Sequence, residues 1–365
     1  MEHKFHKILY YFLKLTICLV FFIGLLYPLY PFNSMQIVGA SNKASTFEQP
    51  EVEHFFTHCL LVNPTLAFSD NNFMAKDYDK DCLTTSEFKK ILESFYLKGY
   101  MLVNANMCFE VDENGNAYKT SPTLPKGKKP LIISIDDVNY DHRKMHLGMA
   151  DKLVVDKNGT LCSMIDGKLD YEREFVSVIN NFVNLHPDFS YKNSKAMLCL
   201  TGYDGILGYR TQTGDKTEID CAKQVVKKLK QEGYYFACHS YGHYHMQKVS
   251  NGTFDKEIEQ WHNEVEPIID KTNIYVYPYG ENLILDNGEV AYKHKLLLKS
   301  GFKLFCGVGD KHFYSYYPFH VERSKQVLFM DRRPMDGYSI RAHKDEYSDF
   351  FDCYSVYDKC RKVLI

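Results

Sequence analysis

Two groups of residues in this sequence carry the donor atoms that metal sites use. Asp136 and Asp137 are adjacent, His239 and His243 are four residues apart, and each pair directly follows an apolar stretch. Adjacent carboxylates at the end of a buried segment raise one another's pKa or attract a cation. Imidazole and carboxylate together suit zinc. The pattern predicts that Asp137, His239 and His243 bind one divalent metal, for which zinc is the expected ion.

Asp136 is then left without a ligand role. Because a metal lowers the pKa of bound water to about 7, a neighbouring carboxylate can act as base for that water. Taken singly, an Asp-Asp pair is more often a solvated turn, and a His-x-x-x-His pair is more often a core or surface pair. Their joint placement after successive apolar stretches favours a catalytic site.

The elements that must position these residues alternate along the chain. Such alternation of short apolar strands with amphipathic helices predicts a largely parallel sheet, open or closed into a barrel. In both cases reactive residues gather at the carboxyl ends of the strands. The expected strands are 131–135, 196–200, 234–238, 274–277 and 302–305, and the expected helices are 172–185, 218–232, 253–270 and 290–300.

The N-terminus is typical of a targeting segment. Lys4, Lys7 and Lys14 precede an apolar run from Leu15 to Phe32, which is about the length that a membrane-spanning helix needs. A basic N-terminal flank stays in the cytoplasm. Residues 1–40 are therefore expected to be a cytoplasmic tip and a single-pass signal anchor, or a signal peptide if cleaved, with the rest of the chain outside the cell.

Two further segments follow. Residues 41–128 are expected to be an N-terminal α+β extension, and a loop rich in Pro, Gly and Lys leads into the main domain, 129–365. The formal net charge of −2 gives no basic excess of the kind that nucleic-acid binders carry. Nucleic acid is therefore not an expected partner.

The motifs resemble those of a known family. Ser134-Ile135-Asp136-Asp137 is similar to the first motif of the NodB-type polysaccharide deacetylases, His239-Ser240-Tyr241-Gly242-His243 fits their His-Ser/Thr-x-x-His second motif, and Tyr277-Pro278-Tyr279-Gly280 looks like the third. The resemblance covers about residues 130 to 335. It implies a distorted (β/α) barrel.

The resemblance also implies roles for single residues. Asp136 would be the general base, and Asp137 would bind the metal together with His239 and His243. Pro278 and Tyr279 would form one wall of the acetyl pocket, with the backbone N–H of Tyr279 facing the oxyanion. The reaction implied is removal of N-acetyl groups from an N-acetylated polysaccharide by hydrolysis of a non-peptide amide.

The chain departs from the family pattern in three places. Many members have Gly after the second Asp of the first motif, where this chain has Val138. Many members carry an Arg two residues before the third-motif Pro, where this chain has Val276. Arg333 is the candidate replacement that would orient the base, and a surface Arg-Asp ion pair is the alternative. A late Leu-x-His motif supplies a general acid in the family, and here it has no clear match; His343, His312 and His320 are the candidates.

Other interpretations stay open. A catalytically weak or inactive relative of the same fold would bind glycan without cleaving it, and a different amidohydrolase would act on a peptide or small amide, although His-Glu-x-x-His is absent. The loop 201–210, which mixes Gly, Tyr and Arg, could contact substrate or pack on the rim of the barrel.

Overall fold

The structure is a computed structural model that describes residues 50–283, 288–316 and 327–361. The expected membrane segment, residues 1–40, lies outside these ranges. In the ranges described, no helix combines the length and the apolar character needed to span a bilayer. The following account concerns the compact unit that starts at Gln49.

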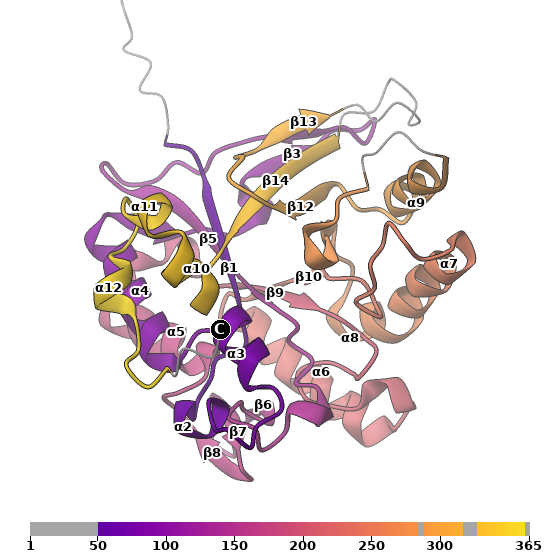
Figure 1. Cartoon of the computed structure of the whole chain (residues 1–365). Helices are drawn as coiled ribbons and strands as arrows, with labels where there is room; N and C mark the ends of the chain where they lie inside the picture. Colours follow the sequence, from indigo (N-terminus) through magenta and orange to yellow (C-terminus); the bar gives the residue numbers. More distant parts are fainter. Residues whose placement is uncertain (1–49, 284–287, 317–326, 362–365) are drawn as a thin grey trace, which may run out of the picture. The chain divides into compact units, whose positions relative to one another are not determined.

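Seven parallel strands close into a barrel (Figure 1). The ring closes because β1 pairs with β5 on one side and with β14 on the other. The predicted parallel sheet with helices is therefore confirmed, in its closed form. In order around the ring, the strands are β1 (Glu53–His58), β14 (Val327–Pro334), β12 (Leu304–Val308), β11 (Ile274–Val276), β10 (Tyr235–Cys238), β9 (Met197–Leu200) and β5 (Lys129–Asp136).

Smaller strands lie outside the ring. β2 pairs with the start of β5 and β13 runs antiparallel to β14, while two separate antiparallel sheets are built by β3 with β4 and by β6, β7 and β8. Their bounds are β2 (Tyr100–Leu102), β3 (Phe109–Val111), β4 (Ala117–Lys119), β6 (Lys152–Val155), β7 (Leu161–Ile165), β8 (Lys168–Asp170) and β13 (Tyr314–Tyr316).

Helices lie around the outside of the barrel (Figure 1). A capping box begins α4, in which the side chains of Thr84 and Glu87 each accept a hydrogen bond from the other's backbone N–H. The helices are α2 (Pro64–Ala67), α3 (Ala75–Asp81), α4 (Thr85–Leu97), α5 (Phe175–Leu185), α6 (Lys216–Gln231), α7 (Asn251–Gln260), α8 (Glu266–Ile269), α9 (Gly288–Lys299), α10 (Gly337–Ala342), α11 (Lys344–Tyr347) and α12 (Cys353–Val356).

The described part of the segment 41–128, from residue 50 onward, is not separate from the barrel. It was expected to be an extension before the main domain, yet its strand β1 pairs with β5 over six consecutive residue pairs and is one of the seven ring strands. The loop near residue 128 therefore connects two parts of one folding unit. β1 carries His54 and His58, and these polar residues interrupt the apolar pattern from which a strand is predicted.

Side chains alternate between the two faces of each ring strand. One buried apolar cluster contains one residue from each of four ring strands: Ile132 of β5, Met197 of β9, Ala237 of β10 and Leu328 of β14. These side chains are on the face of each strand that points into the barrel. The larger cluster, with Ile133 among its members, lies between strands and helices. Counting in steps of two from the inward positions brings Asp136, His239 and Arg332 to the inside of the barrel at its carboxyl end.

Candidate active site

Asp136 is the last residue of β5 and is almost completely buried. Both carboxylate oxygens accept hydrogen bonds from Arg332: Nη1 donates to Oδ1 over 2.7 Å and Nη2 donates to Oδ2 over 3.0 Å. Burial opposes ionisation of Asp136, but the Arg332 guanidinium outweighs this cost and holds the pKa well below its usual range. Asp136 is therefore ionised, as a base must be before it accepts a proton.

The structure corrects the expected partner of Asp136 from Arg333 to Arg332. Arg333 points the other way and pairs with Glu53, while its Nη2 donates to the carbonyl of Asp310. The physical reason is the two-residue period of a strand, which sends neighbouring side chains of β14 to opposite faces. Arg333 is in an ion pair away from the site, as the alternative expected, but its partner is Glu53 and not an aspartate.

Asp137, His239 and His243 come together as a group. One ligand atom from each residue lies within 4.8 Å of the others. His239 Nδ1 is 3.0 Å from the carbonyl oxygen of Val276, an acceptor, so Nδ1 carries the proton and Nε2 is left with a free lone pair. Burial lowers the pKa of His239 to about 4, which keeps the ring neutral at pH 7. A neutral imidazole with Nε2 free is the form that binds a metal.

A cation fits this group. Asp137 Oδ1 is buried without a hydrogen-bond partner in the described structure, a condition that costs free energy unless something compensates the charge. It lies 3.8 Å from His243 Nε2. Two imidazole nitrogens and one carboxylate oxygen form a three-residue donor set of the kind that catalytic zinc uses.

Backbone strain is concentrated around these residues. Asp137, Ser240, His243 and Tyr279 have φ angles of 55°, 59°, 52° and 57°, in the left-handed region that residues other than Gly rarely adopt. Each such conformation costs about 1–3 kcal/mol and persists only where neighbouring contacts impose it. The strained loops therefore carry the ligand residues in orientations that a relaxed chain would not hold.

A cavity of about 470 Å³ opens above the group, a size typical of small-molecule sites. Tyr279 lines it with its ring about half exposed. That ring stacks on His245 at 4.0 Å and contacts the His243 ring at 4.6 Å. Pro278 is buried beneath it in the 3-10 turn Pro278–Gly280. Of the two residues predicted for this wall, Tyr279 lines the cavity beside the ligand group and Pro278 is not among the lining residues.

Neither of the two expected general-acid candidates that the structure describes lines the cavity. His343 pairs with Glu346 and is absent from the cavity lining. His312 pairs with Glu53, on the outer side of the barrel with Arg333. His320 lies outside the described residues. Their observed partners and their absence from the cavity lining argue against His343 and His312 as the general acid.

His58 is the histidine that the sequence reading missed. It ends β1 directly beside Asp136, its registered partner in β5, and it lines the cavity. Its Nδ1 lies 2.8 Å from the carbonyl of Asp81, an acceptor, so Nδ1 donates and Nε2 is the nitrogen left for a substrate. A histidine at the end of a strand was the available signal, but the strand itself had not been recognised.

The described residues contain two other groups of His and Asp with closely spaced ligand atoms, Asp141–His142–Asp204 and His146–Asp151–Asp166. In the first, Arg210 and Arg143 already pair with the carboxylates, so no uncompensated charge calls for a cation. All ten cysteines in the described part of the chain are free thiols.

Comparisons with known proteins agree with the motifs. The model of the polysaccharide deacetylase family matches residues 193–294. This match confirms the family resemblance over the part of the chain that carries His239, His243, Pro278 and Tyr279. A search of curated proteins found no match.

Three solved structures are similar to this chain. A provisionally assigned polysaccharide deacetylase from Mycobacterium smegmatis shares 15% identity over 42% of this chain and 44% of its own, with a TM-score of 0.28. A family 4 carbohydrate esterase from Streptomyces lividans, in complex with acetate, shares 20% over 32% and 51%, with a TM-score of 0.22. The Bc1960 peptidoglycan N-acetylglucosamine deacetylase shares 15% over 50% and 75%, with a TM-score of 0.26. The chain thus spans less than half of the first structure and about half of the second.

Proposed function

We propose that this protein is a metal-dependent hydrolase that removes N-acetyl groups from a cell-surface or cell-wall polysaccharide. The observation that carries the proposal is the shared cavity, in which Asp136, held ionised by Arg332, adjoins the group Asp137, His239 and His243. The family match over residues 193–294 supports the same reaction class.

Asp137, His239 and His243 would hold the divalent ion, with zinc as the proposed metal. Such an ion supplies a Lewis acid for the acetamide carbonyl and a lowered pKa for water. Arg332 contributes by fixing both oxygens of Asp136, so that the carboxylate is oriented as well as ionised. Asp136 would take one proton from the attacking water.

The remaining steps use other residues of the cavity wall. The backbone N–H of Tyr279 would donate a hydrogen bond to the oxyanion, with Pro278 closing the acetyl pocket behind it. His58 would give a proton to the leaving nitrogen through Nε2, because an amine anion cannot leave unaided. The amide C–N bond breaks, water supplies the oxygen that the acetyl group gains, and the proton that Asp136 takes from water balances the one that His58 gives to the nitrogen.

We also propose a location for this reaction. The basic residues and apolar run within residues 1–40 support a single-pass membrane anchor with the catalytic part outside the cell. A polysaccharide substrate is consistent with that location. Protease protection of a C-terminal tag in intact cells, compared with lysed cells, would contradict the outside location.

The first test is acetate release by the full chain from N-acetylglucosamine oligomers and cell-wall glycan, with and without zinc. Asp136→Asn should lower the rate by about 10²- to 10⁴-fold, the usual contribution of a general base. Zinc binding that is retained together with no release from any glycan would instead support the relative that only binds glycan.

A second substrate separates His58 from Asp136. His58→Gln should lower the rate on acetamides by about 10²-fold or more, yet leave the hydrolysis of 4-nitrophenyl acetate nearly unchanged, because its phenolate leaves without a proton. Asp136→Asn should lose both activities. His343→Gln, at a histidine outside the cavity, is the matched control. Equal losses on both substrates would argue against His58 as proton donor.

A further inference from the structure

One loop touches both metal-ligand segments of the barrel. This bridging loop, residues 201–210, follows β9, and its backbone binds the segment after Asp137: Leu207 N–H donates to the carbonyl of Val138 over 2.8 Å and Gly208 N–H donates to that of Asn139 over 3.0 Å. These two acceptors directly follow the strained residue Asp137 in the chain.

The same loop also binds the segment between the two histidines. The N–H groups of Gly202 and Tyr203 both donate to the carbonyl of Tyr241, over 2.8 and 3.0 Å. The approach is so close that a Cβ on Gly202 would lie 2.3 Å from the Tyr241 ring. Because Tyr241 lies between His239 and His243 in the chain, the loop links the two histidine ligands to the carboxylate ligand.

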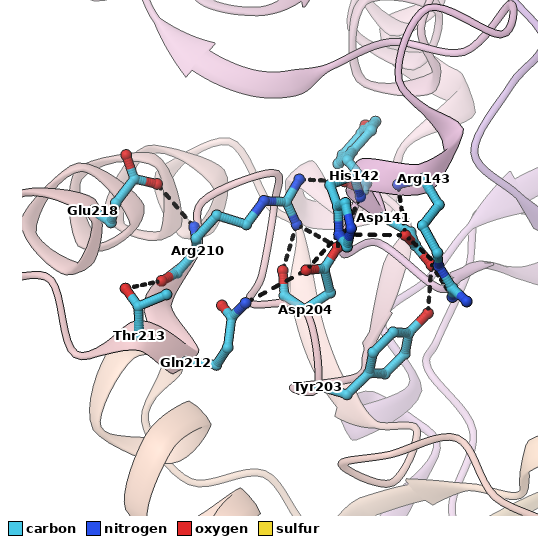
Figure 2. A network of polar contacts seen from close by, with 10 residues as sticks. Asp141, His142, Arg143, Tyr203, Asp204, Arg210, Gln212, Thr213 and Glu218 are labelled. Atoms are coloured by element: carbon cyan, nitrogen blue, oxygen red, sulfur yellow. Dashed lines mark hydrogen bonds and ion pairs between the residues drawn. The ribbon is translucent and has the colours of Figure 1, made fainter.

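Asp204 and Arg210 form an ion pair within the loop, and both also bind the segment after Asp137, as Figure 2 shows. Asp204, only 6% exposed, accepts hydrogen bonds from the backbone N–H of His142 over 2.7 Å and from Arg210 Nη1 over 2.8 Å. Arg210 Nη2 donates to the carbonyl of Tyr140 over 2.6 Å. One guanidinium thereby holds both its own loop and the segment after Asp137.

These contacts account for the strain found earlier. Asp137 and Tyr140 both have positive φ, 55° and 52°, and such conformations need surrounding contacts that over-determine them. The bridging loop supplies contacts at Tyr140 itself and at Val138 and Asn139, the two residues between the strained positions. The interior of the loop is packed rather than open, since Ile206 and Leu207 are fully buried. The sequence left open whether this loop contacts substrate or packs on the rim of the barrel, and the structure shows that it packs.

We propose that Arg210 and Asp204 are positioning residues for the metal-ligand group. Through the bridging loop they fix Asp137 relative to His239 and His243, although neither touches a ligand atom in the group. The proposal rests on the proposed function for the identity of the three ligands. Its consequence is that the pair sets zinc affinity and not only the stability of the fold.

Arg210→Lys is the sharpest substitution, because lysine keeps the charge but cannot donate in two directions from one planar group. We expect zinc affinity, measured by chelator competition on the full chain, to fall about 10- to 100-fold, as is typical when outer contacts of metal ligands are lost. Bound Co²⁺ should show an altered visible absorption spectrum in the variant, since that spectrum reports ligand geometry.

Arg341→Lys is the matched control. Arg341 also pairs with a buried aspartate, Asp79, over 2.9 Å, but it belongs to α10 and lies apart from the bridging loop. Both variants should lose similar melting temperature without metal, whereas only Arg210→Lys should lose zinc affinity. Asp204→Asn should reproduce the loss, and the double variant should lose less than the sum of the two.

Two results would overturn the proposal in distinguishable ways. If the wild type binds zinc through Asp137, His239 and His243, and Arg210→Lys binds it with equal affinity and an equal Co²⁺ spectrum, the pair merely stabilises the fold and the proposed function stands. If the wild type binds neither zinc nor Co²⁺, both the positioning role and the metal-dependent function are wrong.

Discussion

Arg332 and Arg333 are neighbours in the chain with opposite surroundings. Arg332 is 1% exposed and binds Asp136 with both terminal nitrogens, whereas Arg333 pairs with Glu53 in a partly exposed position. A buried carboxylate that loses its cation cannot be solvated, so the free-energy cost of burying its charge is no longer compensated. A partly exposed carboxylate that loses its cation is solvated by water instead, so the loss is small. The two residues therefore form a natural pair of test and control.

Arg332→Met should lower the free energy of unfolding by about 3–5 kcal/mol, and Arg333→Met by about 1 kcal/mol or less. The pKa of Asp136 is depressed in the folded protein, so the stability it contributes is present above about pH 4 and is lost as the pH falls further. Without the guanidinium, burial raises the pKa of Asp136, so the gap between wild type and Arg332→Met should narrow as the pH falls, first as the variant's Asp136 takes up a proton and further below about pH 4. Urea unfolding with a chelator present, repeated from pH 3 to 8, measures this gap.

A constant gap across that pH range would contradict the role given to Arg332. Activity offers a second measurement, because burial alone raises the pKa of Asp136 once the guanidinium is gone. The acid limb of the acetate-release profile should then move to higher pH in Arg332→Met and stay in place in Arg333→Met.

At the scale of elements, the sequence predicted the strands whose inward faces are apolar, including β5, β9, β10 and β11. It did not predict β1 and β14, because their inward positions carry His54, His58 and Arg332, which break the apolar pattern. The gathering of Asp136, Asp137, His239 and His243 followed from predicted strands. The contact of Arg332 with Asp136 and the place of His58 in the cavity could not be predicted. Both depend on β14 and β1, which the apolar pattern did not indicate.

The N-terminus of α5 contains a titratable link between elements. Glu174, fully buried, accepts a hydrogen bond from the backbone N–H of Leu60, just after β1, and one from the hydroxyl of Tyr140. Burial raises the pKa of Glu174 to about 8. The folded protein therefore keeps a proton that the unfolded chain releases above about pH 4, so this residue makes the protein less stable as the pH rises from about 4 to 8.

Glu174→Gln removes that titration. We expect the variant to gain stability relative to wild type as the pH rises across this window, by at most about 1.4 kcal/mol for each pH unit. Urea midpoints from pH 4 to 8 measure the difference. Glu172→Gln, at an exposed position two residues earlier, is the control and should follow the wild type. Parallel curves for Glu174→Gln and wild type would show that Glu174 is ionised in the folded protein.

At the scale of the whole molecule, zinc should stabilise the fold if it binds the folded protein alone. Stabilisation by such a ligand follows its concentration and reaches about 4 kcal/mol at 1,000 times the dissociation constant. The melting temperature of the wild type should rise with added zinc and fall back when a chelator is added. His239→Ala should show neither change, because it removes one of the three donors. An equal rise in His239→Ala would place the zinc elsewhere.

The order of strands in the ring has a consequence during synthesis. Of the ring strands β1 is made first and can pair with β5 after about eighty more residues, but its other neighbour, β14, begins about 190 residues after the end of β5. Until β14 has been made, β1 keeps one edge unpaired at the gap that β14 will fill, here called the seam. Unpaired strand edges of this kind favour misassembly. His58 and Arg332 flank that seam, so a prematurely terminated chain can neither seal the barrel nor orient Asp136.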